Sequence, residues 1–305
     1  MDGGFTERNN AQRADGPGGR EPLGVRQGLD ATMPSTFDLV ARSYRVTAFQ
    51  DSSKPGVASQ DGWCLVEADQ TVRVAAIDGV TPSARTPTVE GVDGARFATR
   101  FIAEHLGDAT SPAGRLLNNA NQRLVEMFRG VVPADRPRAC VAVVEIDQAG
   151  RLEAVLHGDC EVWIRRGSAW AQLLGGSCVD PRVDGEWQEW VDANPHATLE
   201  ELQEYERRRG VPEAWVCPPI GMFDTTKPRS ATLSCNAWDE VVVATDGGRL
   251  DPERLTRLAP WLAEQRSWER ERIGNGTDGV RRAKPHDDRT VLRIERVTAL
   301  APQPN

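Results

Sequence analysis

The order of apolar segments in this sequence predicts an α+β fold in which helices cover a layered antiparallel β-sandwich. Two strand-like segments, residues 72–79 and 240–248, are rich in valine and alanine and run into Asp-Gly. The elements also follow a particular order: a pair of strands, two helices, more strands, and then a helix and a last strand. Since a doubly wound parallel sheet requires regular alternation of strands and helices, this order favours the antiparallel arrangement.

The composition indicates a globular protein without a nucleic-acid or membrane partner. The 305 residues are 39% hydrophobic, which is enough for a sizeable core, and the formal net charge is -8. No apolar run reaches the roughly 18 to 20 residues of a membrane span, and the N-terminal segment has no signal-peptide core. The six cysteines lack CxxC spacing, so we expect reduced thiols in a cytoplasmic protein.

The sequence divides into one domain and two tails. Residues 1–36 show no hydrophobic period, and we expect a disordered tail there. The domain is predicted over residues 37–298, followed by a C-terminal tail at 299–305. A charged, tryptophan-rich segment at about 178–219 is predicted to be a helical insertion. Its helix begins at the capping box of Thr198 and Glu201 and ends at Gly210.

The first half of the domain begins with strands. Residues 37–48 alternate sufficiently for a first strand, and a loop at 50–60 follows. The next two strands form a hairpin that starts after Asp61 and ends at Asp78. Because antiparallel neighbours run in opposite directions, these two aspartates are expected at the same edge of the sheet.

Two amphipathic helices separate this hairpin from the next strands. The first is predicted over residues 94–106, and the second starts at an N-cap pair, Ser111 and Pro112. Its apolar face is expected to carry Leu117, Ala120, Leu124 and Met127. Residues 139–170 then predict a three-strand meander with Asp159 at its second turn.

The second half of the domain ends in a helix and a strand. A short strand at 231–233 precedes the segment 240–248, which delivers Asp246 at a strand end. Asp251 and Pro252 are predicted to cap a short helix. The last strand runs through Val291, Ile294 and Val297, directly after Asp287 and Asp288.

Five aspartates lie at strand ends or strand turns, although they are far apart in the sequence: Asp61, Asp78, Asp159, Asp246 and Asp287. Carboxylates suit hard cations, and no Cys and His group shares a spacing that would suit a soft metal, so we expect Mg²⁺ or Mn²⁺. Several carboxylates brought close together would repel strongly without cations or protonation. Two such ions can hold a bridging hydroxide and clamp a phosphoryl group for in-line attack, which is a phosphatase design.

Five motifs resemble, in order and approximate spacing, the signature motifs of metal-dependent type 2C serine/threonine protein phosphatases. They are SQDGW at 59–63, AAIDG at 75–79, HGDCEVWI at 157–164, VVVATDGG at 241–248 and HDDRTVL at 286–292. The resemblance covers about residues 37–297. It implies two stacked antiparallel β-sheets flanked by helices, an α-β-β-α sandwich, with a dinuclear metal centre at one end.

The resemblance also implies roles for individual residues. Asp61, Asp78 and the carbonyl of Gly79 are expected to contact the metals, and Asp246 and Asp287 to complete the site. Asp159 would serve a third ion. Asp288 occupies a companion position, where we expect it to orient its neighbour.

This sequence departs from the family pattern at the phosphate-binding positions. Many members that act on phosphoproteins have an arginine five residues before the first aspartate, where this chain has Gly56. Lys54 could replace it as a point charge or could be a solvated loop lysine. Eukaryotic members have a histidine where this chain has Val80, so either metal-bound water protonates the leaving group or the activity is altered. His286 could also protonate a leaving group or be solvated, whereas His157 is predicted to be structural.

The leading hypothesis is a cytoplasmic, Mg²⁺- or Mn²⁺-dependent serine/threonine phosphatase that uses direct attack by a bridging metal hydroxide. Its partners would be a phosphoprotein substrate and a cognate kinase or regulator. Two alternatives stay open: a non-catalytic phosphatase-like binding module, and a dedicated regulator phosphatase with a narrow substrate range. Tryptophans of the insertion, Trp187, Trp190 and Trp215, are expected either to form a lid or docking surface or to pack the insertion itself.

Overall fold

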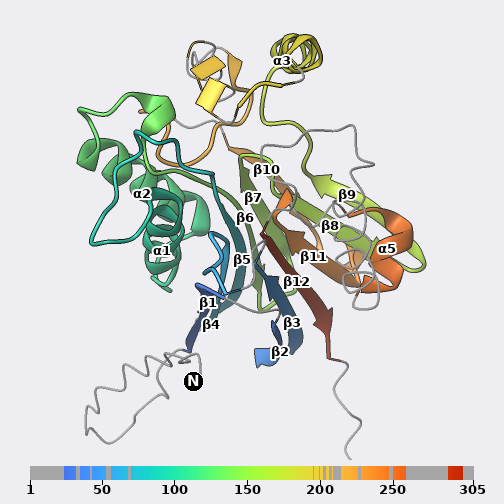
Figure 1. Cartoon of the computed structure of the whole chain (residues 1–305). Helices are drawn as coiled ribbons and strands as arrows, with labels where there is room; N and C mark the ends of the chain where they lie inside the picture. The colour runs from blue at the N-terminus through green and yellow to red at the C-terminus, as the bar shows by residue number, and fades with distance from the viewer. Residues whose placement is uncertain are drawn as a thin grey trace, which may run out of the picture.

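The computed structural model describes most of the chain between residues 24 and 297. The described ranges are 24–31, 35–41, 43–52, 56–67, 70–194, 196–198, 200–201, 204–205, 208, 214–225, 228–246, 250–258 and 288–297. Within them, two six-stranded antiparallel sheets pack face to face, and helices cover their outer faces (Figure 1). The predicted α-β-β-α sandwich is therefore confirmed.

Sheet 1 holds the predicted hairpin at its centre. Its strands, in spatial order, are β1 (Val25–Leu29), β4 (Gly62–Glu67), β5 (Thr71–Gly79), β6 (Ala139–Asp147), β7 (Leu152–His157) and β10 (Arg229–Leu233). All neighbouring pairs are antiparallel.

Sheet 2 brings together strands from both ends of the chain. Its order is β2 (Ser35–Ala41), β3 (Tyr44–Asp51), β12 (Arg289–Arg296), β11 (Glu240–Ala244), β8 (Glu161–Arg166) and β9 (Ala169–Leu174). The last strand, β12, lies between β3 and β11, so an early and a late segment become neighbours at the centre of the sheet.

Helices cover both outer faces. α1 (Gly94–Leu106) and α2 (Ala113–Met127) pack on sheet 1, and α5 (Pro252–Thr256) packs on sheet 2 through the buried Leu255. α3 (Pro181–Ala193) belongs to the insertion and stands beyond one end of the sandwich (Figure 1). Short 3₁₀ turns occupy Pro133–Asp135 and Cys235–Ala237. No helix among the described residues is long and apolar enough to cross a membrane.

Alternation along the strands assigns each side chain to one layer of the core. In β5, Val74 and Ala76 lie in the apolar layer between the sheets, whereas Ala75 and Ile77 pack against α1 and α2. Continuing this alternation by one residue puts Asp78 on the inter-sheet face, where the apolar layer ends. The position of Asp78 therefore follows from the same period that builds the core.

The prediction of a disordered tail over residues 1–36 is wrong for its last part. Val25–Leu29 form edge strand β1, and β2 begins at Ser35. Gly28 of β1 sits against the indole of Trp63, and a Cβ at Gly28 would lie 2.0 Å from its Nε1 atom. The sequence hides this strand because its partner, β4, lies more than thirty residues further along the chain. Residues 1–23 lie outside the described residues.

Two strand predictions also need correction. The single strand expected over residues 37–48 is a hairpin, in which β2 and β3 meet where Ala41 pairs with Tyr44. The expected meander over 139–170 is not one sheet, because β7 belongs to sheet 1 and β8 to sheet 2. The chain crosses between the sheets at Gly158 and Asp159. Apolar strands of both sheets look alike in sequence, so their sheet membership is decided only by packing.

Several boundaries differ in detail from the predictions. α2 has Pro112 rather than Ser111 at its N-cap, and Met127 is 53% exposed instead of lying on the apolar face. Val297 lies just past β12 and is also exposed. The capping box is confirmed, since the amide and hydroxyl of Thr198 donate to Glu201 and the amide of Glu201 donates back to the hydroxyl. The tail expected at 299–305 lies outside the described residues, and the domain boundary at 298 stays a prediction.

Candidate metal site at one end of the sandwich

Asp61 and Asp78 come from neighbouring strands of sheet 1. Gly62 pairs with Ile77, so the residues next to this pair, Asp61 and Asp78, follow at the same edge of the hairpin. Asp61 is buried, with 2% of its surface exposed, and Asp78 is half-buried. On the other side of β5, Asp78 pairs with Cys140 of β6.

Asp159 lies where the chain crosses from sheet 1 to sheet 2. β7 ends at His157 and β8 begins at Glu161, so Asp159 belongs to the connection between the sheets. Gly158 has a φ of 80°, and a Cβ there would lie 2.2 Å from the sulfur of Cys140. Glycine therefore permits both the left-handed turn and the close approach that bring Asp159 to this end.

Sheet 2 delivers carboxylates to the same end. Ala244 ends β11, pairing with both Glu161 and Val291, and Asp246 follows two residues later. The amide of Thr245 donates to the carbonyl of Thr290, which extends the ladder by one pair. Asp288 precedes β12 and is buried. Its neighbour Asp287 and His286 lie outside the described residues, as do Gly247 and Gly248.

Strand pairing brings four of these carboxylates to one end of the sandwich, because Gly158 packs on Cys140, the partner of Asp78, and Ala244 pairs with Glu161. Burial raises the pKa of the Cys160 thiol well above its ordinary value, and the charges of Asp78, Asp159, Asp246 and Asp61 raise it further. The four charges act on this buried thiol, which agrees with the strand pairing that brings the carboxylates to this end. Burial and the charges of Asp159 and Asp78 likewise raise the pKa of Cys140.

Gly79 lies in a cradle that only glycine fits. A Cβ at this position would lie 2.6 Å from the carbonyl oxygen of Gln60 and 3.0 Å from the carbonyl oxygen of Ala95. Both contacts are with backbone, which has little freedom to move aside. The close packing fixes the Gly79 backbone directly beside the residue that precedes Asp61.

The predicted metal ligands have the chemistry that a hard divalent cation prefers. They consist of carboxylates and one backbone carbonyl, which are oxygen ligands of the kind that Mg²⁺ and Mn²⁺ prefer. Within the part of the chain that the structure describes, no three Asp, Glu, His or Cys side chains are close enough together to enclose an ion. The assignment of these residues as metal ligands therefore stays a prediction.

Comparison with solved structures identifies the fold. RsbX, in a crystal structure with magnesium, is 10% identical to this chain at a TM-score of 0.53, and the alignment covers 86% of this chain and 100% of that one. The serine/threonine phosphatase Stp1 from Staphylococcus aureus is 11% identical at a TM-score of 0.53, with 89% and 99% covered. The chain has the type 2C phosphatase fold. No protein-family model matches the chain, and no curated protein sequence does so either.

In this type 2C fold the loop before the first aspartate does not present an arginine. Gly56 has a φ of 77°, in the left-handed region that disfavours arginine and most other residues, and its Cβ direction faces open space. The hydroxyl of Ser52 donates to the carbonyl of Val57 and closes this turn. Lys54 lies outside the described residues.

The position after the second Asp-Gly is apolar in structure as well as in sequence. Val80 packs against the core between the two sheets, and its amide donates to the carbonyl of Arg138. Arg138 therefore lies opposite Val80, just beyond the paired ends of β5 and β6, and this position was not predicted from the sequence. Another cationic residue, Arg289, is buried and lies 3.6 Å from the carboxylate of Asp51, so its charge is balanced inside the fold.

The insertion of this type 2C fold starts from the carboxylate end. Val179 forms a β-bridge with Trp215, and the amide of Gly158 donates to the carbonyl of Cys217. Trp190 stacks on Tyr205 with ring centroids 4.7 Å apart, and Trp187 packs on both rings. These contacts favour the interpretation of the two tryptophans as packing of the insertion.

His157 is structural, as predicted. It is buried at the end of β7, and burial lowers its pKa to about 4, so the imidazole is neutral at pH 7. The six cysteines are free thiols, and five of them are buried. The expectation of reduced core thiols is confirmed for those five.

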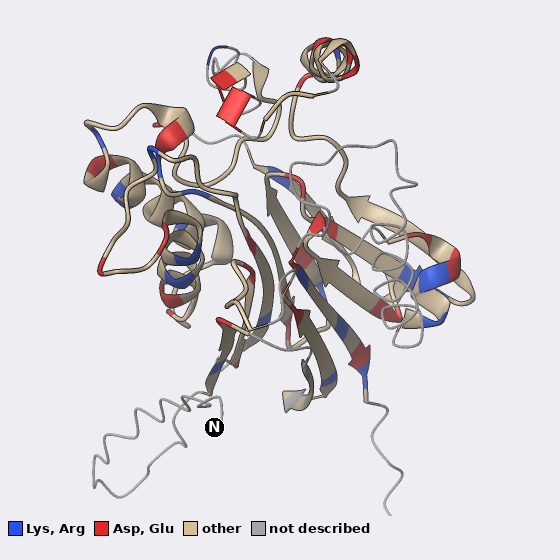
Figure 2. Cartoon of the chain, viewed as in Figure 1, with Lys and Arg blue, Asp and Glu red and all other residues tan. Residues whose placement is uncertain are grey.

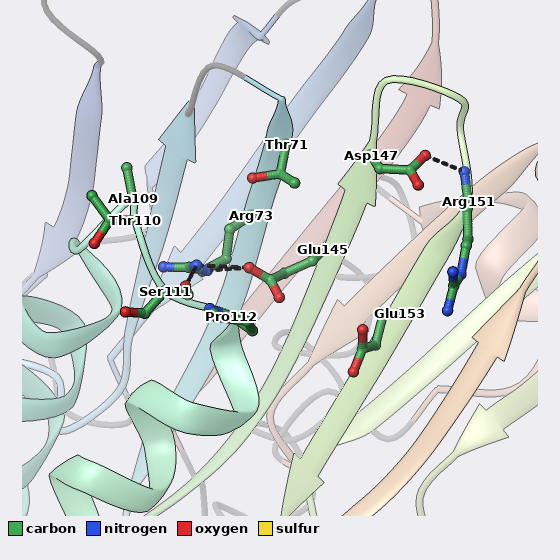
Figure 3. Close-up of a pocket in the computed structure, with 10 residues that line it drawn as sticks. All are labelled: Thr71, Arg73, Ala109, Thr110, Ser111, Pro112, Glu145, Asp147, Arg151 and Glu153. Carbon is green, nitrogen blue, oxygen red and sulfur yellow. Dashed lines mark hydrogen bonds and ion pairs between the residues drawn. The ribbon is translucent and has the colours of Figure 1, made fainter.

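A pocket of about 320 Å³ lies at the opposite end of sheet 1 (Figure 3). It surrounds Arg73, whose guanidinium contacts Glu145 at 2.7 Å and donates to the carbonyls of Leu106, Asp108 and Ser111. The other carboxylate oxygen of Glu145 accepts from the amide of Ala113 at the start of α2. This network ties the α1–α2 connection to the sheet, so we assign it a structural role.

Proposed function

We propose that this protein is a metal-dependent phosphatase that hydrolyses phosphate monoesters of serine or threonine in a phosphoprotein in the cytoplasm. The observation that supports this most strongly is that strand pairing brings Asp61, Asp78, Asp159 and Asp246 to one end of the sandwich. The fold is shared with a serine/threonine phosphatase and with a protein crystallised with magnesium. Neither hydrophobic packing nor chain connectivity requires four carboxylates at that end.

Under this proposal, Asp61, Asp78, the carbonyl of Gly79, Asp246 and Asp287 hold two Mg²⁺ or Mn²⁺ ions, and Asp159 serves a third. When bound, such ions lower the pKa of water and neutralise charge on a phosphoryl group. The chain's own contribution is to hold carboxylates of both sheets at a common edge despite their mutual repulsion. The apolar layer behind them, including Val80 and Cys160, excludes water from the inner side of the site.

The phosphate itself needs a cationic contact from the chain. Lys54 remains one proposal for this contact. Arg138 is a second, because it lies in register with Val80 beside the strand that carries Asp78. Arginine can bind a phosphoryl group through two parallel hydrogen bonds, which lysine cannot do.

The proposal is tested by assaying purified protein with Mn²⁺ on an aryl phosphate and on a phosphoserine peptide. We expect hydrolysis that a chelator abolishes and added Mn²⁺ restores. Asp246→Asn should lower kcat by roughly 100-fold or more, because it removes a ligand charge from the site. The same change should leave the free energy of unfolding of the metal-free protein nearly unchanged or raised, since it relieves repulsion.

Two results would contradict the proposal. If folded wild-type protein with Mn²⁺ hydrolyses neither substrate, catalysis is abandoned, and if Asp246→Asn has wild-type turnover, the site assignment is wrong. Asp239→Asn is the matched control, because Asp239 accepts a hydrogen bond from Gly167 on the surface of the chain. This substitution also removes one negative charge, but at a position outside the proposed site, so the variant should retain wild-type turnover.

A dedicated regulator phosphatase is the second candidate function. The left-handed turn at Gly56 and the core packing of Val80 favour it, because both positions lack the polar group that general phosphoprotein phosphatases present. The partners would then be one phosphoprotein and its cognate kinase or regulator. Activity on a single phosphoprotein with little on generic phosphopeptides would distinguish it from the first candidate.

A further inference from the structure

The backbone of Gln60, directly before Asp61, is held from two distant parts of the chain. Its amide donates to Oδ2 of Asp288 at 2.6 Å, and its carbonyl accepts from the hydroxyl of Thr99 at 2.7 Å. Asp288 lies directly before β12 of sheet 2, whereas Thr99 lies on α1. Both side chains are buried, with 4% and 2% of their surfaces exposed.

The backbone of Asp61 is held in the same way. Its carbonyl accepts from Nε2 of Gln50 at 2.8 Å, and its amide donates to the hydroxyl of Ser59 at 3.1 Å. Gln50 lies on β3 of sheet 2 and is also buried. Four hydrogen bonds thus converge on these two residues, one from α1, one from the preceding loop and two from the adjacent ends of β3 and β12.

The same peptide also determines where Gly79 lies. The carbonyl oxygen of Gln60 accepts from Thr99 and is the atom that a Cβ at Gly79 would meet at 2.6 Å. A shift of this carbonyl would therefore change the spacing between Asp61 and the Gly79 backbone. Both belong to the proposed metal site.

We propose that Thr99, Gln50 and Asp288 are positioning residues, which fix the Gln60–Asp61 backbone so that the Asp61 carboxylate is set for a divalent cation before the ion arrives. This inference rests on the proposed function. A carboxylate held in advance binds an ion without first ordering its own backbone. Removing a supporting hydrogen bond beyond the ligands typically weakens metal affinity by roughly 10- to 100-fold.

Thr99→Val is the sharpest variant, because valine has nearly the shape of threonine and lacks only the hydroxyl. Mn²⁺ binding to the metal-free protein is measured by calorimetry, and unfolding by urea is measured in parallel. We expect Thr99→Val to weaken Mn²⁺ affinity by roughly 10-fold, and Thr99→Ser, which keeps the hydroxyl, to restore most of it. Gln50→Leu is the second variant, with the same expected loss, and serves if Thr99→Val fails to fold.

Glu145→Gln is the matched control for lost stability. Glu145 lies on β6 at the opposite end of sheet 1 from the carboxylates, where it accepts hydrogen bonds from Arg73 and from the amide of Ala113. The substitution should lower resistance to urea and leave Mn²⁺ affinity unchanged, which separates positioning from general weakening of the fold. If wild-type protein binds no Mn²⁺, the proposed function itself is overturned. If wild type binds Mn²⁺ and Thr99→Val and Gln50→Leu bind it equally well, only the positioning role is overturned.

Discussion

At the scale of single residues, Asp78 at the end of β5 and Val80 just after it differ in polarity although they lie two residues apart. Asp78 continues the inter-sheet face of β5 where the apolar layer ends, whereas Val80 returns to packing against the core. The chain therefore carries a carboxylate at the proposed metal site and an apolar side chain two residues further on. Gly56, in the loop before Asp61, likewise has no polar side chain, and its backbone is left-handed.

Buried thiols give a residue-scale prediction for stability at high pH. Burial against α1 and α2 raises the pKa of Cys64 from 9.0 to about 12. Between these pH values the unfolded chain loses the proton and the folded chain keeps it, so stability falls as pH rises. From pH 9 to pH 11, we expect Cys64 to account for about 2 kcal/mol of this loss.

Urea unfolding of wild type and Cys64→Ala at several pH values measures this effect. Cys64→Ala should be less stable by about 1 kcal/mol at pH 8, because it leaves a small cavity, and less sensitive to pH above 9. Cys235 is only half-buried, so Cys235→Ala is the matched control and should keep the wild-type pH dependence. If the free energy of unfolding of wild type and of Cys64→Ala fell equally with pH, Cys64 would not be the source of the loss.

At the scale of elements, strand register and close backbone packing position the candidate site. The pairing of Gly62 with Ile77 brings two aspartates to one edge, and the crossing at Gly158 brings a third. The ion pair of Arg73 and Glu145 has the complementary role at the other end of sheet 1, where it anchors the start of α2. One end of the sheet is thus stabilised by balanced charge, and the other carries gathered negative charge.

Gly79 and Gly114 provide an element-scale prediction with a built-in control. Gly79→Ala places a methyl group 2.6 Å from the carbonyl of Gln60, and we expect it to destabilise the protein by about 1–3 kcal/mol. Gly114 lies in α2 with open space around its Cβ direction, so Gly114→Ala should stabilise by up to about 1 kcal/mol. Urea unfolding checks both, and a Gly79→Ala protein as stable as wild type would show that this contact is not tight.

At the scale of the whole molecule, negative charge gathers at the end of the sandwich where the proposed site lies. The net charge is -8, and the sequence of α3 has four acidic residues and one basic residue. Acidic colour is seen on α3 in Figure 2. The insertion starts beside Gly158, so α3 stands at the carboxylate end. Such a field attracts cationic ligands and repels anionic ones.

This field predicts a substrate preference if the protein is a phosphatase. A phosphoserine peptide flanked by Lys and Arg should have a KM roughly 3- to 10-fold lower than one flanked by Asp and Glu at low ionic strength. A peptide with neutral flanks should fall between them, and the difference should shrink at 0.5 M salt because of screening. Equal KM values at low salt, or the reverse order, would contradict a role for this charge.

Much of the architecture was predictable because it depends on local patterns. Periodicity placed α1 at Gly94–Leu106 and the β4–β5 hairpin, and Asp251 with Pro252 marked the start of α5. Edge strand β1 and the separation of β7 from β8 were not predictable in this way. Both depend on pairing with strands that are distant in sequence. The hydrophobic pattern of a strand does not show which other strand it pairs with.

The sequence by itself determined which residues could bind a cation, because Asp61, Asp78, Asp159 and Asp246 each end or interrupt an apolar strand. Only the tertiary structure decided that these four share one end of the sandwich, and that Thr99 and Asp288 support the backbone before Asp61. Thr99 lies 39 residues from Gln60 and Asp288 lies 228 residues from it. Hydrogen bonds over such separations depend on how the sheets and α1 stack, which is set by packing of the whole core.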